Sequence, residues 1–269
     1  MEIKNDASHP HPRPRNSTAR RQLATLVAVG ATLTSAIAFT LWVGTDGSRG
    51  FSGDAGAGTG IAPELPKPKV DMEIVRGSED AGKTVNITLD DGPDPRWTPK
   101  ALELLAKNGA KAVFCMTGPN AARHPDLVKQ VVAAGHRLCN HSVSHDTAMD
   151  KKPVEYQEKE ILDAKHSIDE ASGGEELRYY RAPGGAFTPQ SRQLAAAYRM
   201  RSLGWNVDPS DFRQPGADAI VRAVKNQLPK GPTVLLHDGG GNRAQTMQAL
   251  ERLLPWFKEQ GYAFSFPKA

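Results

Sequence analysis

Two adjacent aspartates at the end of an apolar segment are the first residues in this chain that could do chemistry. The run 87–89 reads as a buried strand, and Asp90 and Asp91 follow it directly, ahead of a Gly-Pro break. Two like charges side by side repel each other, and folding gains nothing from placing both at a buried strand end. A cation that neutralises them, or a shifted pKa on one, would account for the pair. The pair therefore predicts metal ligands, a partner for the second aspartate and an acid elsewhere in the chain.

His141 and His145 have the spacing of metal ligands. Two histidines four residues apart can bind one metal ion from a helical turn or a tight loop. With one aspartate they form a set that leaves coordination positions open for water and substrate, as catalytic zinc sites do. A lone pair of this kind is more often structural. The metal-binding interpretation is stronger here because the strand before His141 is expected to neighbour the strand that ends in Asp90-Asp91.

Three later segments add polar groups after strand-like runs. Arg181 could pair with a carboxylate, and the Pro-Gly-Gly turn at 183–185 offers N–H groups that suit an oxyanion. The segment 205–212 supplies further carboxylates among aromatic side chains, and His237 ends an apolar strand ahead of three glycines. That position makes His237 a candidate general acid. Taken singly, the three also fit a plain turn, an ordinary loop and a core-edge histidine.

These polar residues follow strands in a regular alternation of strands and helices. Strands are expected at 85–89, 111–116, 136–139, 177–180, 200–203, 233–236 and 263–266, and helices at 99–108, 125–134, 153–172, 189–197, 217–228 and 243–260. This alternation indicates a parallel sheet with helical crossovers. Seven units fit an open doubly wound sheet or a barrel. Polar residues after nearly every strand favour the barrel, because an open sheet binds ligands at one switch point. The predicted fold class is α/β, a distorted (β/α)7 barrel of mostly parallel strands.

Five of these segments resemble, in order, the five motifs of the polysaccharide deacetylase family, carbohydrate esterase family 4. They are Thr88–Pro93, His141–His145, Arg181–Gly185, Asp208–Phe212 and Leu235–His237. The resemblance spans about residues 83–266 and implies a distorted barrel of seven or so strands. It implies a hydrolase that removes N-acetyl groups from N-acetylglucosamine-type residues of an extracellular polysaccharide, either peptidoglycan or chitin-like, using one divalent ion with zinc expected.

By position, the resemblance also assigns roles to single residues. Asp90 would be the catalytic base and Arg181 its partner, while His237 would protonate the leaving amine and Asp208 would tune that histidine. The remaining assignments are Asp91, His141 and His145 as metal ligands, the Gly184 N–H at the oxyanion, Leu235 at the acetyl methyl, and Trp205 and Phe212 as substrate contacts. Leu89 and Phe212 depart from the family's usual Phe and Trp. Neither replaces a ligand, acid or base, so an active enzyme is expected.

Three other functions remain open at this point. An O-acetyl xylan esterase would use the same site on a different bond. A non-catalytic glycan- or metal-binding relic of the fold would be expected to lack a ligand or the base, and here none is missing. A glycosidase would need two carboxylates and no metal.

The first 82 residues are expected to lie outside the catalytic domain. Residues 1–22 hold five basic and two acidic residues and read as a disordered cytoplasmic tail. The uncharged run 23–43 is long enough to cross a bilayer as a signal-anchor, or is a signal peptide cleaved near Ala38. Residues 44–82 read as a linker rich in Gly, Ser and Pro, with the domain boundary between about 69 and 83.

The same segment predicts where the protein works. Positive charge ahead of the apolar run keeps the N-terminus inside and sends the rest outside, so an extracytoplasmic enzyme is expected, anchored in the membrane or secreted. Much of the formal net charge of +4 lies in the tail, so no basic patch suggests nucleic acid.

Cys115 and Cys139 fall in consecutive strands and could form a disulfide if those strands are neighbours. Two separate buried thiols are the alternative.

Overall fold

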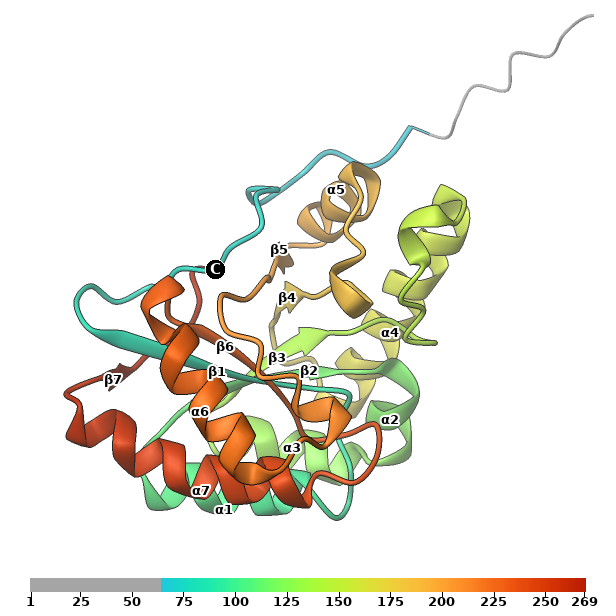
Figure 1. Cartoon of the computed structure of the whole chain (residues 1–269). Coiled ribbons are helices and arrows are strands. Elements are labelled where there is room, and N and C mark those ends of the chain that lie inside the picture. The colour runs from blue at the N-terminus through green and yellow to red at the C-terminus, as the bar shows by residue number, and fades with distance from the viewer. Residues whose placement is uncertain (1–63) are drawn as a thin grey trace, which may run out of the picture. The chain divides into compact units, whose positions relative to one another are not determined.

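The computed structural model describes residues 64–269, which alternate between strands and helices (Figure 1). The strands are β1 (Thr84–Asp90), β2 (Ala112–Met116), β3 (Arg137–Asn140), β4 (Leu177–Tyr180), β5 (Arg201–Ser202), β6 (Thr233–His237) and β7 (Ala263–Phe264). The α-helices are α1 (Thr98–Lys107), α2 (Gly118–Arg123), α3 (Pro125–Ala133), α4 (Val154–Ser172), α5 (Pro189–Ala197), α6 (Ala217–Gln227) and α7 (Ala244–Glu259). Short 3-10 turns lie at Met149–Lys151, Pro183–Gly185, Asp211–Arg213 and Leu228–Lys230.

All seven strands belong to one parallel sheet. The order is β5-β4-β3-β2-β1-β6, and β7 pairs with the beginning of β1. The two ends of the sheet come together where the segment after β5 runs beside β6: Val207 makes a parallel bridge to Val234, and Asn206 hydrogen-bonds to Thr233. The sheet is therefore curled into an incompletely closed barrel, which confirms the predicted α/β class and its parallel strands.

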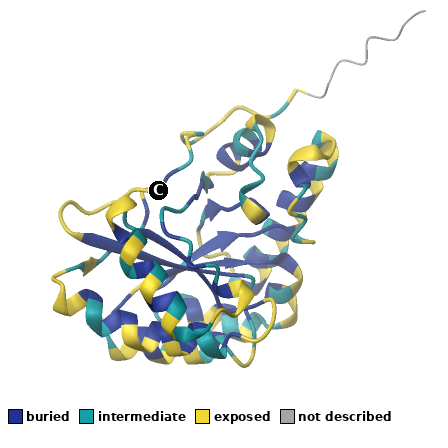
Figure 2. Ribbon diagram, in the orientation of Figure 1, coloured by how far each residue is buried: buried dark blue, intermediate teal, exposed yellow. Residues whose placement is uncertain are grey.

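The helices form a continuous layer outside the sheet. Each helix contacts the next one in space: α6 contacts α7, α7 contacts α1, α1 contacts α3, α3 contacts α4, and α4 contacts α5. Strands β1 to β6 are mostly dark blue in Figure 2 because they are buried, whereas β7 and the outer faces of the helices are not. Within residues 64–269, none of the helices combines the length and apolarity that a membrane span requires.

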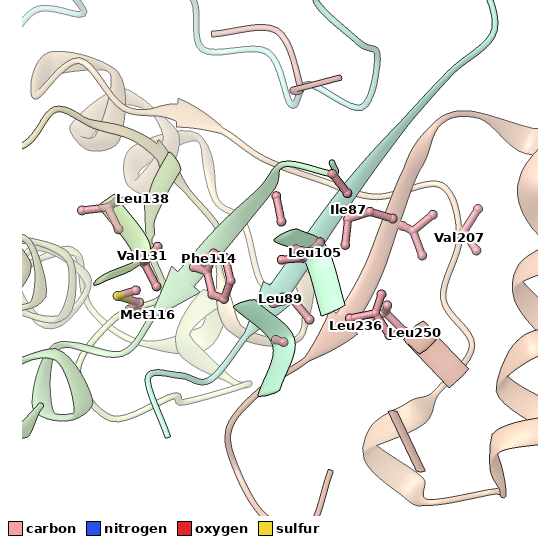
Figure 3. Close-up of a cluster of buried hydrophobic side chains, with 14 of the residues drawn as sticks. Ile87, Leu89, Leu105, Phe114, Met116, Val131, Leu138, Val207, Leu236 and Leu250 are labelled. Carbon is pink, nitrogen blue, oxygen red and sulfur yellow. The ribbon is translucent and has the colours of Figure 1, made fainter. Parts of the chain in front are cut away.

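Alternation along the strands sorts the side chains into two layers. In β1, Ile87 and Leu89 pack between the sheet and the helices, in the same cluster as Phe114 of β2 (Figure 3). Residues in the opposite phase, Thr88 and Asp90, point to the other face of the sheet because successive side chains in a strand alternate. That inner face is where the polar residues at the strand ends converge.

Two details differ from the sequence-based expectation. The segment 118–123, for which no element was expected, is a helix, α2, and its proline is tolerated because it lies in the first turn. Part of the expected linker belongs to the folded domain, because Val75 is buried and pairs with Leu203. The tail at 1–22, the apolar run at 23–43 and most of the linker lie outside the described residues.

Candidate active site

Asp90, the last residue of β1, is held by a buried arginine. The Nη1 of Arg181, just after β4, donates to Asp90 Oδ1 at 2.6 Å and to the Thr88 hydroxyl at 2.9 Å. The rest of the guanidinium donates to the carbonyls of Leu203 and Gly204. Both charged side chains are almost fully buried. The predicted pairing of Arg181 with Asp90 is present, and it fixes one carboxylate oxygen while Oδ2 makes no bond to the guanidinium.

His141 follows β3 and is oriented by the same region. Its Nδ1 donates to the Arg181 carbonyl oxygen at 2.8 Å, because a carbonyl can only accept. The Nε2 therefore carries the lone pair and points to the two aspartates, 3.5 Å from Asp90 Oδ2 and 3.6 Å from Asp91 Oδ1. Burial lowers the pKa of His141 more than the neighbouring carboxylates raise it. A neutral imidazole with a free Nε2 is the form that binds a metal ion.

Asp91, His141 and His145 bring one ligand atom each to a common point. The three atoms lie within 4.8 Å of one another, and His145 Nε2 is 3.2 Å from Asp91 Oδ1. Asp91 Oδ1 is buried and accepts no hydrogen bond from any described residue. Two nitrogen donors and an unsatisfied carboxylate oxygen around one point fit a divalent cation. The three predicted metal ligands are thus brought together beside Asp90.

The backbone at this point is strained and tightly packed. Asp91, Ser142 and His145 all have positive φ angles, of 73°, 65° and 55°. The loop after β6 passes so close to Asp91 that a Cβ on Gly240 would lie 2.5 Å from its Oδ2, and one on Gly239 would lie 2.2 Å from its carbonyl oxygen. Only glycine fits these two positions. Strain of this kind persists when the surrounding structure holds it, and it is common at functional sites.

His237, the last residue of β6, is held by Asp211. The His237 Nδ1 donates to Asp211 Oδ1 at 2.7 Å, and its backbone N–H donates to Oδ2 at 3.0 Å. The hydroxyl of Thr246 also donates to Oδ2. This corrects the predicted role of Asp208, whose carboxylate instead accepts the backbone N–H of Ser210. The left-handed backbone at Ser210, with a φ of 53°, turns the chain so that the second aspartate of the segment faces the histidine.

The surroundings of His237 favour its charged form. Burial lowers its pKa, but the hydrogen bond and charge of Asp211, together with the charges of Asp90 and Asp91, raise it more, to about 8. Because Nδ1 is engaged by Asp211, the other nitrogen, Nε2, is the one available to a ligand. An imidazolium of this kind can donate a proton at neutral pH.

The proposed ligands, acid and base line one pocket of about 680 Å³, within the size range of ligand-binding pockets. They are Asp90, Asp91, His141, His145, Arg181 and His237, whereas Asp211 lies behind His237 and is not part of the lining. The predicted substrate contacts line it too: Gly184, Leu235, Trp205 and Phe212. Phe212 is 43% exposed and its ring lies against His237, with centroids 5.6 Å apart. Trp205 lies over the Arg181 guanidinium. Asp208 is also in the lining, so it remains at the site without touching the histidine.

Sequence reasoning missed several residues of the pocket wall. Asn120 of α2 donates to the Asp91 carbonyl at 2.7 Å, and Arg123 one turn later also lines the pocket. Arg243 is buried and donates to the carbonyls of Gly239 and Gly240, which fixes the glycine loop beside Asp91. These residues belong to no strand end, so their position along the chain did not single them out.

Cys115 and Cys139 form a disulfide beneath the site. They are opposite each other in the β2–β3 pairing, and Cys115 is also opposite Asp90 in the β1–β2 pairing. The bridge thus joins β2 to β3, the strand that leads into His141, and the alternative of two separate thiols is excluded in this structure.

Comparison with known proteins agrees with this geometry. The sequence profile of polysaccharide deacetylases matches residues 77–203. A peptidoglycan-N-acetylglucosamine deacetylase of Bacillus cereus is 41% identical over 184 residues, which cover 68% of this chain and 85% of that protein. The chain belongs to the polysaccharide deacetylase family. A second relative in this family, a chitooligosaccharide deacetylase of Sinorhizobium fredii, is 34% identical over 71% of this chain and 93% of its own length.

The fold is that of the same family. A family 4 carbohydrate esterase from Streptomyces lividans, solved in complex with acetate, superposes with a TM-score of 0.62. It shares 31% sequence identity, and the match covers 69% of this chain and 93% of that one. The family resemblance inferred from the five motifs is therefore confirmed, and the chain is a hydrolase of the deacetylase class.

Proposed function

We propose that this polysaccharide deacetylase is a metal-dependent enzyme that removes N-acetyl groups from N-acetylglucosamine residues of a cell-wall-type glycan and releases acetate. The observation that carries the proposal is the convergence of Asp91, His141 and His145 on one point beside the Asp90–Arg181 pair. A ligand set of this kind next to a separate, anchored carboxylate is suited to the hydrolysis of an amide by water.

A cation bound by these residues would supply Lewis-acid chemistry. A divalent ion in such a site polarises a carbonyl oxygen and lowers the pKa of water, so that water can attack near neutral pH. The chain's own residues do the remaining work: they position the acetamide, take one proton and give another.

Asp90 is placed to act as the base. Arg181 engages its Oδ1, so Oδ2 takes the proton from water as the water oxygen attacks the acetamide carbonyl carbon. The Gly184 N–H, in the turn after β4, is proposed to donate to the oxygen that becomes negative. Leu235 supplies an apolar wall suited to the acetyl methyl group.

His237 is placed to act as the acid. Its Nε2 donates a proton to the nitrogen of the acetamide as the carbon–nitrogen bond breaks, so the sugar leaves as an amine and the acetyl group as acetate. Asp211 keeps the imidazole in the orientation and the charge state that this step requires. Trp205 and Phe212 offer flat apolar surfaces for the sugar ring.

Acetate release from a panel of acetylated glycans tests the proposal. The panel contains chitin oligomers, peptidoglycan fragments and acetylated xylan, each with and without a chelator. We expect acetate from the first two only, and loss of the activity with chelator. Acetate from xylan alone would replace the proposal with an O-acetyl esterase, and chelator-resistant cleavage of the glycosidic bond would indicate a glycosidase.

We further propose that the catalytic domain works outside the cytoplasm. The support is the uncharged run 23–43 behind a basic tail and the disulfide between Cys115 and Cys139, a bond that persists in oxidising compartments. Cell fractionation with a C-terminal tag tests it. Recovery of the tagged protein in the cytoplasm with both thiols reduced would contradict it, and the mass of the exported protein distinguishes an anchor from cleavage near Ala38.

A further inference from the structure

A buried carboxylate from α4 reaches the loop that carries both histidine ligands. One oxygen of Glu160, Oε2, accepts the backbone N–H of Val143 at 3.0 Å and that of Ser144 at 2.8 Å. These two residues lie between His141 and His145 in the sequence. Glu160 is only 7% exposed, and it does not line the pocket where substrate would bind.

The loop needs such support because its backbone is not that of a helix or strand. Ser142 and His145 both have left-handed φ angles, which are unfavourable for residues other than glycine. The N–H groups of residues 143 and 144 find their acceptor outside the loop, in Glu160. A second link to α4 comes from Asn140, whose amide donates to the Ile161 carbonyl and whose oxygen accepts the Ser142 N–H.

Glu160 has no cationic partner among residues 64–269 in the ion pairs of the structure. A buried carboxylate ordinarily requires a positive charge or several hydrogen bonds. Here the two backbone N–H groups supply charge-assisted hydrogen bonds, which are stronger than neutral ones. A glutamate is thus buried against one loop, and that loop joins two metal ligands.

We propose that Glu160 is a positioning residue of the metal centre. By holding the backbone at residues 143 and 144, it fixes the distance and direction of the two imidazoles so that both Nε2 atoms face Asp91 before a cation arrives. The inference rests on the proposed metal dependence. When a residue that orients the metal ligands from outside the coordination sphere is replaced, the affinity for the metal typically falls by about 10- to 100-fold.

The test compares variants by their affinity for Zn²⁺, measured by competition with a chromophoric chelator. In Glu160→Ala, the Zn²⁺ dissociation constant should rise by about 10- to 100-fold. Glu160→Gln retains an acceptor oxygen and should recover most of the lost affinity. Glu158→Ala, on the same helix, is the matched control, because Glu158 makes no side-chain contact with the loop among the described hydrogen bonds, and it should bind as the wild type does.

Two further readouts separate positioning from general stabilisation. The thermal midpoint of each metal-free variant reports folding, and the visible spectrum of the Co²⁺-loaded protein reports ligand geometry. We expect an altered Co²⁺ spectrum in Glu160→Ala, restored in Glu160→Gln. If Glu160→Ala does not fold, Glu160→Asp, which withdraws the acceptor by one methylene, is measured in its place and should weaken Zn²⁺ binding.

The outcomes distinguish this inference from the function on which it rests. A wild-type protein that binds no Zn²⁺ would refute the metal dependence itself. A wild-type protein that binds Zn²⁺ and releases acetate, with a folded Glu160→Ala variant of equal Zn²⁺ affinity and unchanged Co²⁺ spectrum, would overturn the role of Glu160 alone.

Discussion

The two halves of the active site are built differently. In the proton-transfer half, Asp90 and His237 each have a dedicated partner of opposite charge, Arg181 and Asp211, at 2.6 and 2.7 Å. In the metal-binding half, the Nε2 atoms of His141 and His145 lie 3.6 and 3.2 Å from Asp91 Oδ1, which has no hydrogen bond among the described residues. The first half is complete as protein alone, while the second is suited to a cation, as proposed above.

Removing the cation should disable the metal-binding half and leave the proton-transfer half intact, and it should have the largest effect on activity. A chelator should abolish acetate release while the protein stays folded, because the core and the charge pairs do not depend on the metal. The folded state should lose only the stabilisation that binding supplies, about 2.7 kcal/mol at a metal concentration 100 times the dissociation constant. Acetate release and thermal unfolding, measured on the same samples, check this. Activity that survives complete chelation would contradict it.

Asp90→Asn should disable the proton-transfer half and spare the other. The amide cannot take a proton from water, so we expect kcat to fall by about 10²- to 10⁴-fold. Acetate release at saturating chitin oligomer and saturating Zn²⁺ measures the effect. A variant that keeps wild-type kcat would show that another group is the base.

Asp211→Asn should act through the pKa of His237. The hydrogen bond and charge of Asp211 raise that pKa to about 8 against the lowering effect of burial, so removing the charge should lower it. The acid form of His237 is populated below its pKa, so activity is lost as pH rises through about 8 in the wild type and at a lower pH in the variant. A decrease of about 10²-fold in kcat is expected near neutral pH. The pH profile of kcat measures both effects.

Asp208→Asn is the matched control for this experiment. Its carboxylate lines the pocket but contacts the Ser210 N–H and not His237. The alkaline limb of its pH profile should therefore stay where it is in the wild type. A shift in Asp208→Asn that equals the shift in Asp211→Asn would return the tuning role to Asp208.

Removing the disulfide should have the smallest effect on catalysis. The bridge links Cys115 to Cys139 below both halves, and replacing both with alanine should lower the free energy of unfolding by about 3 kcal/mol on the chain-entropy model. Because hydrogen bonds of the β2–β3 pairing remain, kcat should change far less than in Asp211→Asn. Denaturant unfolding and acetate release measure the two effects. A loss of activity without a loss of stability would show that the disulfide supports the geometry of the active site and not the stability of the fold.

The sequence predicted those parts of the site that follow from strand ends. Parallel strands bring their carboxyl ends to one edge, so the positions of Asp90, His141, Arg181 and His237 follow once the strands are recognised. The choice between Asp208 and Asp211 could not be made in this way. Both lie in one loop, and the backbone turn at Ser210 decides which carboxylate reaches the histidine.

Other features depend on tertiary contacts that have no local pattern. Glu160 occupies an ordinary position on a charged helix, and its contact with the histidine loop appears only when α4 is packed beside that loop. Val75 lies in a Pro-rich approach that resembles a linker, yet it completes a pairing with Leu203, which is more than a hundred residues away. In both cases, long-range packing overrides the local signal. Helix α2 was not predicted because its six residues are too few to show a helical apolar period.

Zinc titration of the wild type, Asp90→Asn and Asp91→Asn tests the division between the two halves most directly. We predict one ion per chain in the wild type and in Asp90→Asn with similar dissociation constants, and binding lost in Asp91→Asn. Equal loss of zinc in both variants, or no stoichiometric zinc in the wild type, would contradict a single ion held by Asp91, His141 and His145 beside an independent base.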